Sequence, residues 1–275
     1  MRLFKYCDAG GIEILRTASI KAASPLELND PFDCQPVPDI VTPESRDALR
    51  SMVLAASQFL QLVLNDHLPP PPGKGSEQFK EENLAILERT VTDENRVRES
   101  MEQSYNAMAI ICFSAVDSHH LMWAHYANKH QGLVIEVETD EEFTLDDGRN
   151  ITNRLHEVKY SNERQIFRFD RPINLNAYTT KGEAWDYDHE WRVLYFKENL
   201  PSRVIAGREM HVRPIKPSFI RAVTMGAKMP EAHRREVEYL LSEPRYNHVE
   251  LFKMQLDPRE YHLTKVPVPR MASRE

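Results

Sequence analysis

Short apolar runs of strand length recur along most of the chain and predict a sheet. The clearest is 107–114, an uncharged run whose length is typical of a buried strand. Runs of similar length lie on both sides of it. They predict further strands at 2–7, 20–23, 132–138, 156–160, 190–196, 210–212, 219–225 and 248–254.

A different spacing, with apolar residues three and four positions apart, predicts helices. It is strongest over 43–66, where a proline at the start suits the first helical turn and the prolines at 69–72 would end the helix. A second and more charged helix is predicted over 77–105. We therefore expect a helical hairpin inserted between segments of the sheet. Shorter helices are predicted at 12–17, 121–127 and 231–241.

This alternation of elements predicts an α+β fold, with a mixed, largely antiparallel sheet and a helical-hairpin insertion. The chain of 275 residues is long enough for one large domain or two small ones. We predict a single domain over 1–275, with 43–105 as the helical insertion. The last residues, 259–275, are basic and contain two prolines, so they are predicted to be a flexible tail.

Glycine is scarce, and its scarcity excludes some modes of nucleotide binding. There are 9 glycines against 18 prolines, the reverse of the usual order. No set of them fits the G-x-G-x-x-G or G-x-x-x-x-G-K-[ST] pattern. A nucleotide would therefore have to be held by side chains rather than by a glycine-rich loop.

Charge and cysteine content indicate a cytoplasmic protein without a membrane segment. The net charge is −7, which gives no support for a basic nucleic-acid face. The three cysteines, Cys7, Cys34 and Cys112, lack C-x-x-C spacing, and free thiols suit a reducing compartment. The N-terminal residues have no apolar core of signal-peptide length. The longest run without an acidic or basic residue, 51–65, is shorter than the ~20 residues of a membrane span.

Aromatic residues are concentrated in the predicted helix 121–127. His125 and Tyr126 share a helical face with Met122, while Trp123 lies off that face. Such a group could line a pocket and stack on a planar ring, or the aromatic side chains could fill the core. The polar tips of His125 and Tyr126 favour the pocket, because buried polar groups need partners.

The strand predicted at 190–196 places Glu190 and Arg192 on one face. Near a cleft, the carboxylate could stabilise a developing cation or accept a proton. The alternative is an exposed ion pair of little energetic value. The segment Asn29-Asp30-Pro31-Phe32-Asp33 forms a rigid turn, whose carboxylates could cap a helix, fix an arginine or contact a ligand.

Metal chemistry has weaker support in the sequence. His119, His120, His125 and His130 lie close together, but their spacing fits no zinc motif, so no metal site is predicted. Asp147, Glu157 and Lys159 resemble the carboxylates and lysine of a metal-dependent nuclease. That arrangement is also expected by chance in a chain of this charge, and it remains an alternative.

Several short motifs follow one another in a characteristic order. They are Phe4-Lys5-Tyr6, Ala23-Ser24-Pro25, Asn29-Asp30-Pro31-Phe32, Cys112-Phe113-Ser114, 121–127 with Gly132, His156-Glu157-Val158-Lys159-Tyr160, Glu190-Trp191-Arg192 and Met225-Gly226. This set resembles the bacterial family known as domain of unknown function 2971. The resemblance covers about residues 1–230.

The order of elements is also similar, more distantly, to that of ADP-ribosyltransferases and related NAD-binding toxins. A short strand with polar residues comes first, a helix and a strand ending in Ser-Pro follow, and a glutamate starts a late strand. This resemblance implies an ADP-ribosyltransferase-like fold. It places Lys5 or Tyr6, Ser24 and a catalytic Glu190 at the site.

The same resemblance implies an ADP-ribosyltransferase-like or NAD-cleaving enzyme, of the kind found among toxins and phage-defence effectors. NAD would be the substrate, and a protein or a nucleic acid the acceptor. Tyr6, Trp123 or Tyr126 would enclose the nicotinamide, and Arg192 would meet a phosphate. Two alternatives stay open: a non-catalytic sensor that binds a nucleotide or a partner, and a metal-dependent nuclease.

Overall fold

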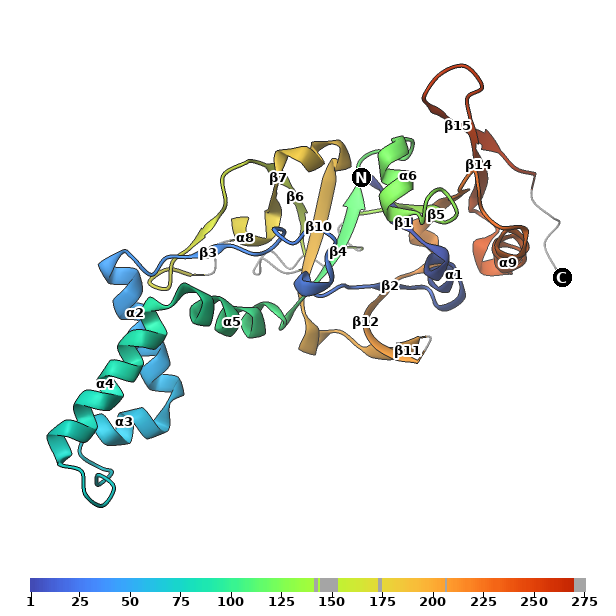
Figure 1. Cartoon of the computed structure of the whole chain (residues 1–275). Helices are drawn as coiled ribbons and strands as arrows, with labels where there is room; N and C mark the ends of the chain where they lie inside the picture. Colours follow the sequence, from blue (N-terminus) through green and yellow to red (C-terminus); the bar gives the residue numbers. More distant parts are fainter. Residues whose placement is uncertain (141–142, 144–152, 173–174, 206, 270–275) are drawn as a thin grey trace.

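The computed structural model describes residues 1–140, 143, 153–172, 175–205 and 207–269. These residues form an eight-stranded sheet in the order β15-β14-β13-β5-β1-β4-β10-β6, with helices on both faces (Figure 1). Neighbouring strands of this described sheet are antiparallel, except that β13 and β14 are parallel. The predicted α+β class, with a mixed and largely antiparallel sheet, is confirmed.

The strands of the main sheet alternate with helices and with strands of smaller sheets. The main-sheet strands are β1 (Arg2–Cys7), β4 (Met108–Ser114), β5 (Leu133–Glu138), β6 (Leu155–Glu157), β10 (Glu190–Phe196), β13 (Ile220–Met225), β14 (Glu250–Leu256) and β15 (Leu263–Pro267). Smaller sheets pair β11 (Ser202–Ile205), β12 (Arg208–Pro214) and β2 (Ser19–Lys21); β3 (Val37–Pro38) and β8 (Ile166–Phe167); and β7 (Lys159–Tyr160) and β9 (Thr180–Lys181). The helices beside the sheets are α1 (Ile12–Thr17), α6 (His120–Tyr126), α8 (Asn176–Thr179) and α9 (Glu231–Leu241).

Two predictions about the strands need correction. The segment 156–160 is not one strand: β6 pairs with β10, whereas β7 pairs with β9 in another sheet. Part of the predicted flexible tail is ordered, because β15 adds to the edge of the main sheet beside β14 and buries Leu263. Pro267 ends β15, and an edge strand tolerates the missing N–H group of a proline.

Apolar clusters lie on both faces of the sheet, as the two-residue period of a strand requires. On one face α1 and α9 pack against Leu3, Ile135 and Val193. On the other face α6 packs its Trp123 against Tyr6 of β1 and Val134 of β5. Among the described residues, no helix combines the length and the apolar composition needed to cross a bilayer.

The insertion 43–105, all of which the structure places, is an arm that extends away from the sheet (Figure 1). The predicted pair of helices is four helices: α2 (Pro43–Ala56), α3 (Gln58–Leu64), α4 (Ser76–Thr92) and α5 (Glu94–Tyr105). Ser57 and Asp93 cause the two breaks, because their side chains accept hydrogen bonds from the first N–H groups of the next helix. We call α2, α3 and α4 the helical arm.

The main sheet opens between β1 and β4. β1 meets β4 at the pair Phe4 and Ser114, while β4 pairs along its whole length with β10 on the other side. Beyond that pair β4 turns to Ala23 instead, whose backbone exchanges two hydrogen bonds with Ile110. The gap between β1 and β4 positions the site described next.

Candidate functional site

A cavity of about 250 Å³ lies where β1 and β4 separate. We call it the split pocket. Five parts of the chain line it, so segments far apart in the sequence meet there. They are Phe4, Lys5 and Tyr6 of β1; Ala23 and the loop residues Glu27, Leu28, Asn29 and Asp33; Ile110, Cys112, Phe113 and Ser114 of β4; Met122 and Tyr126 of α6; and Lys181, Asp188 and Glu190.

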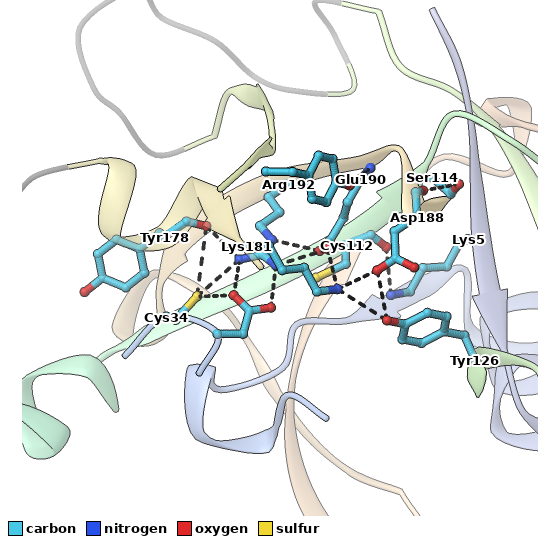
Figure 2. A network of polar contacts seen from close by, with 12 residues as sticks. Lys5, Cys34, Cys112, Ser114, Tyr126, Tyr178, Lys181, Asp188, Glu190 and Arg192 are labelled. Carbon is cyan, nitrogen blue, oxygen red and sulfur yellow. Dashed lines mark hydrogen bonds and ion pairs between the residues drawn. The ribbon is translucent and has the colours of Figure 1, made fainter. Parts of the chain in front are cut away.

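A buried chain of charges forms the floor of the split pocket (Figure 2). The guanidinium of Arg192 is fully buried and donates to both oxygens of Asp33, at 2.8 and 2.6 Å. Its Nε donates to Oε1 of Glu190 at 2.7 Å. The guanidinium thus joins two carboxylates, and a further bond, to the carbonyl of Tyr178, fixes its plane.

The chain continues through Lys181, whose ammonium is also buried. It donates to Oε2 of Glu190 at 3.0 Å and to Oδ2 of Asp188 at 2.5 Å. A third bond of 3.3 Å goes to the hydroxyl of Tyr126, which in turn donates to Asp188. Buried charges are costly unless they are paired and hydrogen-bonded, and this network satisfies that condition for both cations.

Two of the carboxyl groups that line the cavity, Glu190 and Asp188, have pKa values shifted in opposite directions. Burial opposes the ionisation of Glu190, but Arg192 and Lys181 outweigh burial and hold the pKa of Glu190 well below its usual range. For Asp188 burial dominates over the attraction of Lys181, and its pKa is raised. Two carboxyl groups whose environments separate their pKa values are typical of acid–base sites.

One carboxylate oxygen of Asp188 accepts no hydrogen bond from the described residues. Its Oδ2 accepts from Lys181 and Tyr126, whereas its buried Oδ1 has no hydrogen-bond partner among the described residues. Asp188 lines the split pocket, and a buried unpaired oxygen is costly unless a ligand or water completes it. The left-handed backbone of His189, with φ of 42°, separates Asp188 from the start of β10. Strain of this kind is common at functional sites.

The structure brings five of the predicted site residues together: Lys5, Tyr6, Asn29, Tyr126 and Glu190 all line the split pocket. The ammonium of Lys5 reaches across the gap and donates to the carbonyl of Cys112 at 2.9 Å. The Tyr6 hydroxyl donates to the carbonyl of Val116, and its ring meets Trp123 edge-on. The backbone N–H of Glu190 donates to the Tyr160 hydroxyl, which anchors the start of β10.

The other five predicted residues have different positions. Trp123 is fully buried, and its indole N–H donates to the carbonyl of Asp117, so it supports the pocket from behind. Ser24 caps the turn Pro25–Glu27 and donates to Asn106. Arg192 stands behind Glu190 with its donors bound to protein groups rather than facing a phosphate.

Asp30 and His125 lie around the rim rather than in the pocket. Asp30 accepts from the backbone N–H of Phe32 and lines a neighbouring cavity. His125 is exposed, and its ring contacts that of Trp185 at a centroid distance of 5.8 Å. The helix 121–127 therefore divides its aromatic side chains between core, pocket and rim.

Sequence reasoning missed three members of the network: Asp33, Lys181 and Asp188. Asp188 carried a usable signal, because it precedes Glu190 by two residues and could face the same cavity. Asp33 also carried a signal, because it belongs to the 29–33 turn, whose carboxylates could fix an arginine, and in the structure it binds Arg192. Lys181 carried none, since it lies in β9, which belongs to a different sheet from β10.

The residues of the nuclease alternative do not form a site in the described structure. Glu157 and Lys159 are exposed and belong to different sheets, and Asp147 lies outside the described residues. Within the part of the chain that is described, no group of three or more His, Cys, Asp or Glu side chains could hold a metal ion.

Comparison with known proteins supports the first resemblance and leaves the second without support. No curated protein and no solved structure matches the chain. The family described as Protein of unknown function (DUF2971) matches over residues 122–193. That segment includes most of α6 together with Lys181, Asp188, Glu190 and Arg192. The part of the chain that supplies most of the charged network is therefore the part that is similar to the DUF2971 family.

Proposed function

We propose that the split pocket binds the nicotinamide end of NAD and that the protein is an NAD-cleaving or ADP-ribosyl-transferring enzyme. The observation that carries this proposal is the pair Asp188 and Glu190, two buried carboxyl groups at one cavity whose pKa values are shifted in opposite directions. Chemistry at a sugar carbon uses two carboxyl groups with different roles.

The two roles follow from the two environments. When the bond between nicotinamide and ribose breaks, its electron pair goes to the pyridine nitrogen and the ribose becomes an oxocarbenium-like cation. Glu190, held ionised by Arg192 and Lys181, supplies a fixed negative charge near that cation. Asp188 takes the proton of the attacking water or hydroxyl group through its unpartnered oxygen, as the new oxygen–carbon bond forms.

The walls of the pocket suit the leaving group. The rings of Phe4, Tyr6 and Tyr126 line it, and aromatic faces stack on planar heterocycles. Lys5 adds a cation for a phosphate. Because side chains supply all of these contacts, the proposal agrees with the lack of a glycine-rich phosphate loop.

The test is the release of nicotinamide from NAD, measured by chromatography for the wild type and three variants. We expect Asp188→Asn and Glu190→Gln each to lower kcat by about 100-fold or more. Glu157→Gln, an exposed residue outside the split pocket, is the matched control and should keep full activity. Circular dichroism confirms that each variant is folded.

Full activity of both Asp188→Asn and Glu190→Gln would refute the proposal. If the activity is toxic, expression of the wild type should arrest bacterial growth, and the same two variants should relieve the arrest. Growth arrest by all variants alike would contradict the proposed role as a toxin or defence effector.

A second candidate function has one observation in its favour. Both carboxylate oxygens of Glu190 are engaged by Arg192 and Lys181, which suits a rigid binding site as well as catalysis. The protein would then be a nucleotide sensor. Saturable binding of NAD in calorimetry, with no release of nicotinamide by the wild type, would favour the sensor over the enzyme.

A further inference from the structure

A second cavity, of about 490 Å³, adjoins the split pocket. We call it the outer pocket. Lys181 lines both cavities, and the loop before β3 separates them with its two faces. Asn29 and Asp33 face the split pocket, whereas Asp30 and Cys34 face the outer pocket. The same loop and the same lysine thus line both cavities.

Aromatic side chains continue from one cavity to the other along the rim. The ring of Tyr126, in the split pocket, lies 6.4 Å from the ring of Trp185, in the outer pocket. His125 contacts the same Trp185 ring. A ligand that occupies both cavities could follow this aromatic edge from one to the other.

The split pocket is too small for a complete dinucleotide. Sites for drug-sized ligands usually measure roughly 300–1,000 Å³, and the split pocket falls below that range. If one nucleotide half lies there, as the proposed function requires, the remainder must lie elsewhere on the protein. The outer pocket is adjacent and larger.

We infer that the two pockets form a bipartite site for a dinucleotide, whose second nucleoside lies in the outer pocket. This inference rests on the proposed function and extends it to the other half of the ligand. It also gives a role to Asp30, which lines the outer pocket, and to His125, which contacts the Trp185 ring of that pocket.

The lining of the outer pocket matches the parts of a nucleotide. The Phe32 ring is 64% exposed, which leaves an aromatic face for a base. The guanidinium carbon of Arg164 lies 5.2 Å from the centre of that ring and can meet a phosphate of the linker. Glu163 offers carboxylate oxygens to ribose hydroxyl groups.

Calorimetry with three probes tests the inference: NAD, nicotinamide mononucleotide and AMP. We expect NAD to bind at least about tenfold more tightly than nicotinamide mononucleotide, because a stacked base contributes this much. Phe32→Ala should weaken NAD binding by about tenfold and leave the binding of nicotinamide mononucleotide unchanged. Arg164→Gln should act in the same direction, and AMP should bind Phe32→Ala about tenfold more weakly than the wild type.

Phe59→Ala is the matched control, because Phe59 is 54% exposed on the helical arm, and both substitutions should leave the fold intact. Equal affinities for NAD and nicotinamide mononucleotide, or no effect of Phe32→Ala on NAD binding, would overturn the inference while the proposed function stands. Failure of the wild type to bind either NAD or nicotinamide mononucleotide would overturn the proposed function and the bipartite site together.

Discussion

The floor of the split pocket and the helical arm both use ion pairs, but under opposite conditions. Arg192 is fully buried between Asp33 and Glu190. Arg50, on the arm, bridges Asp47 and Glu88 with a side chain that is 31% exposed. The arm also exposes large apolar side chains such as Met52 and Phe59.

The difference shows that the buried network places its charges at fixed points without a clear gain in stability. Surface ion pairs cost little to form and contribute little, whereas a buried network loses hydration that its mutual attraction barely replaces. The network is therefore poor evidence of stabilisation and better evidence that its charges are needed at fixed points. Its members Glu190, Lys181 and Asp188 line the split pocket, as this explanation requires.

The largest expected effect comes from removing the central cation. Arg192→Met should lower the free energy of unfolding by about 3–5 kcal/mol, because Asp33 and Glu190 would remain buried without their partner. Arg50→Met on the arm should give no measurable change. Urea denaturation at pH 7 measures both. If the two substitutions lowered the free energy of unfolding equally, the buried network and the arm would not differ as described.

Glycine substitutions should show the same contrast at a smaller scale. A Cβ at Gly132, just before β5, would lie 2.0 Å from the carbonyl oxygen of Cys7, so Gly132→Ala should cost about 1–3 kcal/mol or more. Gly75, at the start of α4, has nothing within 4 Å of such a Cβ. Gly75→Ala should change stability by less than about 0.5 kcal/mol. Thermal melts of the two variants compare them directly.

A pH series sharpens the role of Glu190. Its pKa is lowered in the folded state from an ordinary value of 4.5, so its ionised form stabilises the protein above that pH. The stabilisation is lost as the pH falls through the folded pKa. We expect Glu190→Gln to be less stable than the wild type at pH 7 and the deficit to shrink at pH 4. A deficit independent of pH would show that packing, not charge, explains it.

The smallest effect is expected on the arm. Phe59→Ser should change the free energy of unfolding by less than about 0.5 kcal/mol, because the ring is already more than half exposed. Urea denaturation is again the measurement. A large loss would mean that the arm is more tightly packed than its exposed apolar side chains indicate.

The spacing of apolar residues predicted the bounds of a strand or helix correctly where those bounds depend on residues within the same element. The run 190–196 and the helix 231–241 have the predicted bounds, because apolar periodicity and burial agree there. It failed where distant partners decide. The strand β15 exists because β14 offers an edge, and the breaks in the arm depend on which polar side chain caps a helix.

For the site, the sequence predicted that Glu190 and Arg192 share a face, and left open whether that face was exposed or functional. Both side chains are buried, which excludes the exposed ion pair, and their burial depends on Asp33 and Lys181, which strand spacing cannot locate. Trp123 shows the reverse case. Its identity suggested a ligand contact, but the packing of α6 on β1 turned it into the core.

By itself, the sequence determined the α+β class, the alternating strands, the inserted helices and the absence of a glycine-rich phosphate loop, because these depend on neighbours along the chain. The tertiary structure alone decided where β1 and β4 separate and which charges meet beneath that gap. The reason is physical: a carboxylate's pKa and a residue's exposure are set by atoms close in space, and here those atoms come from segments scattered between Asp33 and Arg192.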